Sequence, residues 1–316
     1  MIITITQLQY VLAIAEYRNF TIAAEHCHVT QPTLSMQIQK MEEELGILIF
    51  DRNKKPIQLT EVGEKIVVQS KNVIHEAGRI TDIVDQFKGF IGGEFRLGVI
   101  PTVMPTLLPL FLKSFIKKHS KVRLLIEELT TDELVEKLKN GHLDAAIAAT
   151  PLKEDKIKEM PLYYEPFVGY VPESNELFSK NKITVSDLDP QKLLLLQDGH
   201  CFRESVLNLC NFSDIKNEQF QIKSGSFETL IKLSNEGFGM TLLPYLHTLD
   251  LPENEQKKLR QFEEPKPARE ISLIFHQKHL KLHIIEALHE SIASVVRGAI
   301  AFHDVEIISP KHKKAK

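Results

Sequence analysis

Several residue types and patterns are scarce or missing in this sequence, and each absence excludes something. It contains no tryptophan and only three cysteines in 316 residues. A run of about 18 apolar residues is also missing, which argues against a membrane-spanning helix. The N-terminal stretch lacks a basic start and carries Glu16 and Arg18 inside its apolar part, so we expect no secretory signal and a cytoplasmic protein. In that reducing compartment a permanent structural disulfide is not expected.

The composition is that of an ordinary globular protein, with 43% hydrophobic and 26% charged residues. At this length we expect two or three domains. The net charge of -3 argues against a uniformly basic nucleic-acid-binding protein but leaves local basic patches open. We find no P-loop, no Gly-x-Gly-x-x-Gly after a strand, no Ser-His-Asp order and no Cys-x-x-Cys pair. The sequence therefore predicts no enzyme and no bound metal or cofactor.

The first sixty residues predict a helix-turn-helix domain. One helix is expected over about 6–15, a second from Asn19 or Thr21, and a third between the N-cap Thr30 and Gly46. The third helix has an apolar stripe on one side and, on the other, small polar side chains that can bond bases or phosphates. These polar residues are Gln31, Thr33, Ser35, Gln37, Gln39 and Lys40.

A short β-wing is expected next, in the segment ILIFDRNKKPIQLTEVG. Its cations, Arg52, Lys54 and Lys55, can reach a DNA backbone or the minor groove. An interaction-only three-helix domain stays open as an alternative, because the first sixty residues hold five Lys or Arg against six Asp or Glu.

Residues 61–89 predict one long connecting helix. Apolar residues recur every seven positions along it, which is typical of a helix that pairs with the same helix of a second chain. This seam consists of Ile66, Val73, Ile80 and Phe87. A helix packed on its own domain is the alternative.

Strands and helices alternate over residues 90–302, which predicts an α/β regulatory domain with a mainly parallel sheet. We expect one lobe from about 94–163 and 269–302, and a second from about 164–268. Residues 303–316 are expected to form a basic C-terminal tail, disordered at Lys311, Lys313, Lys314 and Lys316.

Two of the three cysteines, Cys201 and Cys210, lie in the segment LLLLQDGHCFRESVLNLCN, which reads as a strand end running into an amphipathic helix. An intact helix separates their Cα atoms by about 13 Å, whereas a disulfide needs roughly 4.4–6.8 Å. The residues alone leave two possibilities: two inert thiols, or a switch that must unfold the helix. His200 and Arg203 lie near Cys201, where cations and a helix start lower a thiol pKa.

The head resembles the LysR-type transcriptional regulators. The resemblance rests on VTQPTLS, then EEELGILIFDR, then LTEVG, in order and at the family's spacing. It implies a winged helix-turn-helix head, a linker helix that pairs two heads, and a two-lobed periplasmic-binding-protein-like effector domain with a cleft between lobes. It also implies DNA-binding roles for the recognition helix and the wing, which we assign to Thr30, Gln31, Pro32, Thr33, Ser35, Gln39, Lys40 and Arg52.

Within that family, the segment DGHCFRESVLNLC is most similar to the hydrogen-peroxide-sensing subgroup. The resemblance implies a peroxidatic Cys201, a resolving Cys210, a reversible disulfide between them, and activation of oxidative-stress genes. It suggests a peroxide pocket made of Thr102, Thr131, His200 and Arg269. The implied partners are promoter double-stranded DNA, hydrogen peroxide, a cytosolic thiol reductant, further copies of the chain in a dimer of dimers, and RNA polymerase.

Other functions stay open at this point. One is a regulator of the same architecture whose cleft binds a small-molecule inducer, with structural cysteines. Another is a thiol peroxidase with an incidental head. A third is a structural chromatin-type DNA binder whose affinity is independent of redox state.

Overall fold

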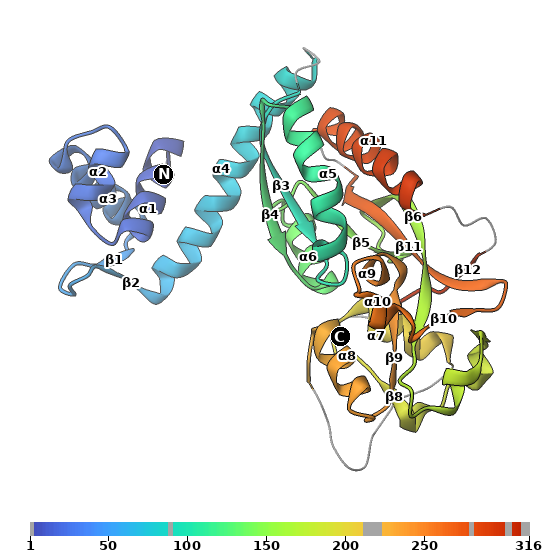
Figure 1. The fold of residues 1–316 in the computed structure, drawn as a ribbon. Coiled ribbons are helices and arrows are strands. Elements are labelled where there is room, and N and C mark those ends of the chain that lie inside the picture. Colours follow the sequence, from blue (N-terminus) through green and yellow to red (C-terminus); the bar gives the residue numbers. More distant parts are fainter. Residues whose placement is uncertain (1–2, 88–90, 211–222, 278–280, 301–304, 311–316) are drawn as a thin grey trace. The chain divides into compact units, whose positions relative to one another are not determined.

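The structure is a computed structural model that describes residues 3–87, 91–210, 223–277, 281–300 and 305–310 (Figure 1). It divides into two compact units, Met1–Lys88 and Gly89–Lys316. The long connecting helix therefore groups with the head. Among the described helices, none combines the length and the apolar character that crossing a membrane requires.

The first unit has the expected helix-turn-helix order. Its elements are α1 (Ile5–Tyr17), α2 (Phe20–His26), α3 (Gln31–Leu45), β1 (Phe50–Asp51), β2 (Gln58–Leu59) and α4 (Glu61–Phe87). Asn19 caps α2 through its side chain, and Thr30 caps α3. Gly46 ends α3 in the left-handed region (φ 67°), where glycine is favoured. The predicted stripe is buried at Leu34, Ile38 and Met41, which confirms the spacing argument.

The second unit contains two hydrophobic cores. The first core is built on β3 (Gly93–Val99), β4 (Val122–Glu128) and β5 (Ala145–Thr150), which run parallel in the order β4-β3-β5. The strands are connected through α5 (Met104–Lys118) and α6 (Thr131–Lys139). α11 (Leu282–Ala299) packs beside α5, as Figure 1 shows. The βαβ prediction is correct for this part of the sheet.

Two long strands pass from the first core to the second. They are β6 (Ile157–Tyr170) and β11 (Lys266–His276), which pair antiparallel with each other, while β11 also pairs antiparallel with β5. The sheet is therefore mixed, and the expectation of a mainly parallel sheet is wrong here. The reason is topological: one strand takes the chain into the second core and the other brings it back, so they run in opposite directions.

The second core is built from shorter elements. In chain order they are a 3₁₀ turn (Glu176–Ser179), β7 (Lys182–Ile183), two more 3₁₀ turns (Val185–Asp187 and Pro190–Lys192), β8 (Leu193–Leu194), α7 (Cys201–Leu209), α8 (Phe227–Asn235), β9 (Met240–Pro244), α9 (Tyr245–Leu249), α10 (Glu253–Gln256) and β10 (Leu259–Phe262). Leu246 of α9 packs in the first core. The strand expected over LLLLQD is only two residues long. The strand expected before α8 lies partly outside the described residues, and Lys223 and Ser224 are not in a strand.

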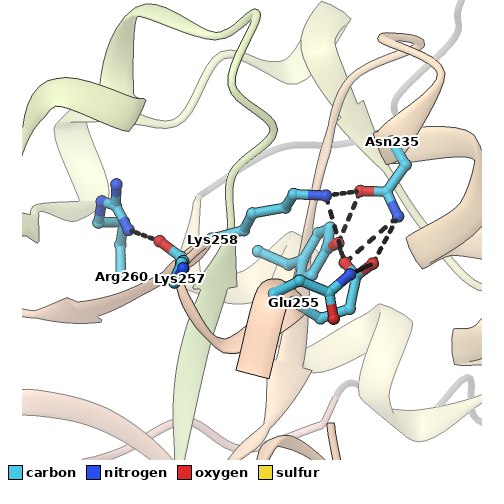
Figure 2. Close-up of polar contacts among 7 residues, drawn as sticks. Asn235, Glu255, Lys257, Lys258 and Arg260 are labelled. Carbon is cyan, nitrogen blue, oxygen red and sulfur yellow. Dashed lines mark hydrogen bonds and ion pairs between the residues drawn. The ribbon is translucent and has the colours of Figure 1, made fainter. Parts of the chain in front are cut away.

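A polar cluster fixes the far end of α8 in this second core. Lys258 Nζ and the buried Tyr170 hydroxyl both donate to Asn235 Oδ1 at 2.7 Å. The Tyr170 hydroxyl also bonds Glu255, and Figure 2 shows Asn235 and Lys258 converging on that carboxylate. Because these residues come from β6, α8, α10 and the turn before β10, the cluster joins three elements and that turn.

The C-terminal segment departs from the sequence-based expectation. Residues Val305–Ile307 form β12, which pairs parallel with the start of β11. The segment 305–310 is therefore not a free tail, because its backbone is bonded to the sheet. The lysines from Lys311 onward lie outside the described residues.

Candidate functional site

The two cysteines of interest occupy opposite ends of α7. Gly199 makes the preceding turn with φ 91°, His200 is the N-cap residue, and Cys201 is the first helical residue. Cys210 is the C-cap residue. Both thiols are free and buried. Cys201 packs within the first core and Cys210 within the second, so a single helix places its two thiols in different cores.

Burial and the polar groups around Cys201 shift the pKa of its thiol in opposite directions. Desolvation raises the thiol pKa, and this effect outweighs the Arg269 guanidinium and the Thr131 hydroxyl, which lower it. Among the described residues, Thr131 Oγ1 has no other hydrogen-bond partner. The backbones at Ala149 and Phe202 also favour the thiolate. The thiol is therefore protonated at neutral pH, and the groups that stabilise its thiolate already lie beside it.

Arg269 is the central cation of the site. It lies on β11, 1% exposed, and its Nη1 donates to Thr102 Oγ1 at 2.8 Å. Nη2 donates to the Thr102 carbonyl at 3.1 Å. The guanidinium carbon lies 5.1 Å from the centre of the Phe202 ring, on the residue after Cys201. The structure thus brings Arg269 of β11 together with Thr102, Thr131 and Cys201, which lie at or just before the starts of α5, α6 and α7.

Glu165 holds Arg269 from the other side, and the sequence did not point to it. Its Oε2 accepts from Arg269 Nε at 3.0 Å and from Nη2 at 2.8 Å. Its Oε1 accepts from the Leu246 backbone N–H at 2.9 Å. A carboxylate on the crossing strand β6 is therefore the counter-ion of the buried guanidinium. A charged residue within the apolar run YYEPFVGYV was the only signal available.

His200 is buried beside the thiol-bearing turn. Burial lowers its pKa, and the nearby Glu128 carboxylate opposes that shift. A Cβ at Gly225 would lie 2.8 Å from His200 Nε2, so the backbone needs glycine there to approach the ring. His200 is therefore held neutral against the loop that leads into α8.

Arg203 serves a different purpose from the one its spacing suggested. Its Nε lies 3.0 Å from Asp198 Oδ1, and its Nη1 donates to the Leu196 carbonyl at 3.3 Å. These contacts brace the turn before Cys201. The cation that lowers the Cys201 pKa is Arg269, which is 68 positions along the chain rather than two.

An aromatic cluster also lies beside the site. The Phe202 ring packs on Phe167 and Phe227, with centroids 5.2 and 5.0 Å apart. The His247 ring lies tilted against Phe227, with centroids 5.1 Å apart. Burial lowers the pKa of His247, Asp250 opposes that shift, and Arg269 adds to it. His247 was not singled out from the sequence, because a lone histidine on a short helix carries no signal.

Cys210 has the surroundings of a sequestered thiol. Burial raises its pKa to about 11, with no second cause. Its neighbours in the second core are apolar. In the described part of the chain, no group of three His, Cys, Asp or Glu side chains is placed to hold a metal ion.

In the head, α3 presents the predicted polar face. Gln31, Pro32, Thr33, Gln39 and Lys40 are exposed, as is the N-cap Thr30, whereas Ser35 is half-buried. Met36, an apolar residue that was not singled out from the sequence, is 60% exposed on the same helix.

The wing residue Arg52 makes internal contacts instead of pointing freely to solvent. Its Nη2 lies 2.8 Å from Glu42 Oε2, and its guanidinium lies over the Phe20 ring at 5.1 Å. Glu42 is buried and also accepts from the Ile49 and Phe50 N–H groups. Arg52 therefore ties the wing to α3.

Comparisons with known proteins agree with this architecture. Residues 5–64 match the family described as "Bacterial regulatory helix-turn-helix protein, lysR family", and residues 88–297 match "LysR substrate binding domain". The chain belongs to the LysR family. It is thus a LysR-type transcriptional regulator with a DNA-binding head, and the resemblance seen in the sequence is confirmed.

Two relatives are similar to this chain over most of its length. The chain is 33% identical over 271 residues to the "Hydrogen peroxide-inducible genes activator" of Pectobacterium carotovorum subsp. carotovorum, covering 86% of this chain and 89% of the relative. It is 31% identical over 299 residues to the "DNA-binding transcriptional dual regulator OxyR" of Escherichia coli K12, covering 95% and 96%.

Solved LysR-family structures are similar over nearly the whole chain. A full-length OxyR variant from Pseudomonas aeruginosa superposes with a TM-score of 0.69 at 34% identity, covering 92% of this chain and 97% of that one. A mutant OxyR of Corynebacterium glutamicum in an H2O2-bound form gives a TM-score of 0.61 at 25% identity, covering 96% and 98%.

The connecting helix of this LysR-family chain has an apolar face that is only partly covered. Ile66 packs on the head core, whereas Val73, Ile80 and Phe87 are 37%, 68% and 93% exposed. Exposure thus increases along the predicted seam with distance from the head. Exposed apolar residues in register along a helix are typical of a helix-pairing surface.

Proposed function

We propose that this LysR-type regulator senses hydrogen peroxide through a reversible Cys201–Cys210 disulfide and activates oxidative-stress genes. The observation that carries the proposal is the position of Cys201, a buried thiol whose charged form is favoured by Arg269 and Thr131. Relatives named as hydrogen peroxide-inducible genes activators support the same function.

The proposed chemistry begins at Cys201. Its thiolate attacks one peroxide oxygen, the O–O bond breaks, and the departing hydroxide takes a proton to become water. Cys201 is then a sulfenic acid. Thr102, Thr131, His200 and Arg269 form the peroxide pocket, in which Arg269 stabilises negative charge and neutral His200 can exchange a proton. Arg203 holds the turn that carries Cys201.

The second step consumes Cys210. The Cys210 sulfur attacks the Cys201 sulfur, the S–S bond forms, and the sulfenic oxygen leaves as a second water. Because a disulfide cannot span an intact α7, this step requires the helix to unwind. A cytosolic dithiol reductant restores both thiols.

The switch would act on DNA through oligomerisation. Copies of the chain pair through Val73, Ile80 and Phe87 of α4, the part of the predicted seam beyond Ile66, which packs on the head core. Two such dimers form a tetramer on promoter DNA. The exposed residues of α3 read the operator, and RNA polymerase is the further partner. In this proposal residues 1–60 read DNA, 61–89 pair the chains, and 90–302 form the two-lobed sensor.

The test uses the full chain and one equivalent of peroxide. Peptide mass spectrometry is expected to show a Cys201–Cys210 disulfide, and footprinting on a promoter is expected to differ between reduced and oxidised protein. Cys210→Ser is expected to stop at the sulfenic acid, trapped by dimedone. Cys27→Ser is the matched control and is expected to respond like the parent chain.

Three outcomes would contradict the proposal. Cys201→Ser responding to peroxide like the parent chain removes the sensor role. Sustained peroxide consumption with a thioredoxin-type reductant indicates a peroxidase. A footprint that changes with a small-molecule inducer but not with dithiothreitol or peroxide indicates a ligand-binding regulator.

A further inference from the structure

The C-terminal segment 305–310 is bonded to the sheet beside the candidate site. Val305, Glu306 and Ile307 lie in register with Lys266, Pro267 and Ala268 of β11. The Ile308 N–H then donates to the Ala268 carbonyl at 2.7 Å. The next residue on β11 is Arg269. The segment is therefore anchored directly before the central cation of the site.

The same segment is bonded on its other side to α7. Asn208 Nδ2 donates to the Ser309 carbonyl at 2.8 Å. Ile308 packs against the second core, which contains Cys210, and Pro310 is buried. Asn208 is in the last turn of α7, two residues before Cys210. One short segment thus joins the start of β11 to the end of the helix between the two cysteines.

This connection opposes any unwinding of α7. Asn208 lies between Cys201 and Cys210, so it must move if these residues are to come within disulfide distance. The Asn208–Ser309 bond would then break, and the Ser309 carbonyl would lose its partner from α7.

We propose that residues 305–310 act as a strap that stabilises the helical form of α7 and so restrains disulfide formation. The part of this inference that concerns the disulfide rests on the proposed function, whereas the part that concerns the helix does not. In the reduced protein the strap keeps Cys210 away from Cys201. In the oxidised protein the contact to Asn208 is lost, which frees the strap on its α7 side.

The first test measures the helix alone, by hydrogen exchange in the reduced full chain. Asn208→Ala is expected to speed exchange of the Leu209 and Cys210 amides by about fivefold, since one hydrogen bond of ordinary net strength corresponds to a factor of roughly 2 to 12. Alanine is a better helix former than asparagine, so lower helix propensity cannot produce that acceleration. Ser309→Ala is the matched control, because it keeps the backbone carbonyl, and it is expected to leave exchange unchanged.

The second test measures the two oxidation steps separately. In Asn208→Ala the sulfenic acid on Cys201 is expected to convert to the disulfide severalfold faster, while alkylation of the Cys201 thiol is unchanged. A chain ending at residue 304 is expected to show a larger effect than Asn208→Ala.

The outcomes separate this inference from the proposed function. Unchanged exchange of α7 in Asn208→Ala overturns the strap, whether or not a disulfide forms. Faster exchange in a chain that never forms the disulfide upholds the strap on the helix and overturns the peroxide switch. Equal conversion rates in Asn208→Ala and the parent chain overturn the restraint on disulfide formation.

Discussion

Arg269 Nη2 lies 2.8 Å from Glu165 Oε2, and both side chains are only 1% exposed. The pair joins the two crossing strands β6 and β11 at positions that lie opposite each other in the sheet. The charge that favours the Cys201 thiolate is therefore fixed in place by a carboxylate 104 positions earlier in the chain.

Glu165→Gln is expected to destabilise the effector domain by about 3–5 kcal/mol, because it leaves a buried guanidinium without its counter-ion. The glutamine amide also cannot serve both Arg269 and the Leu246 N–H. Urea unfolding measures the loss. Glu236→Gln, at an exposed position of the same domain, is expected to change stability by less than about 0.5 kcal/mol. A loss for Glu165→Gln as small as that of the control would contradict this account of the pair.

Thr131→Val is expected to raise the Cys201 pKa further, because it removes the hydroxyl that favours the thiolate. In a chain with Cys27 and Cys210 replaced by serine, alkylation of Cys201 at pH 7 should slow by about fivefold, the size of one hydrogen bond. The parent rate should rise with pH beyond 9, since the thiolate fraction increases tenfold per pH unit below the pKa. Thr131→Ser keeps the hydroxyl and should restore the parent rate. An unchanged rate in Thr131→Val would show that the hydroxyl does not act on the thiol.

Stability is expected to fall as the pH drops from 7.5 to 5. Burial lowers the pKa of both His200 and His247, so the folded state binds protons less readily than the unfolded chain. Their contribution is complete above the unfolded pKa of about 6.5 and is lost as the pH falls through the lower folded pKa. Tm measured against pH should show the loss, with a shallower slope in His247→Gln. An identical slope in that variant would exclude His247 as a contributor.

Ile80→Glu is expected to prevent the proposed dimer from forming, because it places a charge in the α4 seam. Sedimentation velocity at micromolar concentration measures the change. Val68→Glu is the matched control, since Val68 is 55% exposed and lies two positions away from the seam residue Ile66. Equal dimer content in the two variants would place the pairing surface elsewhere.

Local signals made much of this fold predictable. Thr30 and Gly46 mark the ends of α3 because capping depends on neighbouring residues alone. The long helix followed from its heptads, and the parallel strands from their buried runs. Contacts between distant residues were not predictable in this way. Glu165 meets Arg269 across 104 positions.

The candidate site was predictable to the extent that a family pattern carried it. Thr102, Thr131 and Arg269 were named by resemblance, and the structure places them around Cys201. The net rise in the Cys201 pKa was not predictable, because the residues next to Cys201 in the sequence do not show how deeply its thiol is buried. The C-terminal segment was interpreted as a tail because its lysines dominate its composition, whereas the apolar residues before them pair with β11.

The division of α7 between two cores has a thermodynamic consequence for the proposed switch. Oxidation would have to withdraw a thiol from the packing of one core or the other, so the reduction potential of the pair includes repacking energy. For a two-electron couple, about 1.4 kcal/mol corresponds to roughly 30 mV. Substitutions in the first core that loosen the packing around Cys201 would then make the pair easier to oxidise. The apolar interior of this domain would set the oxidant level at which the regulator responds, without any change to the thiols themselves.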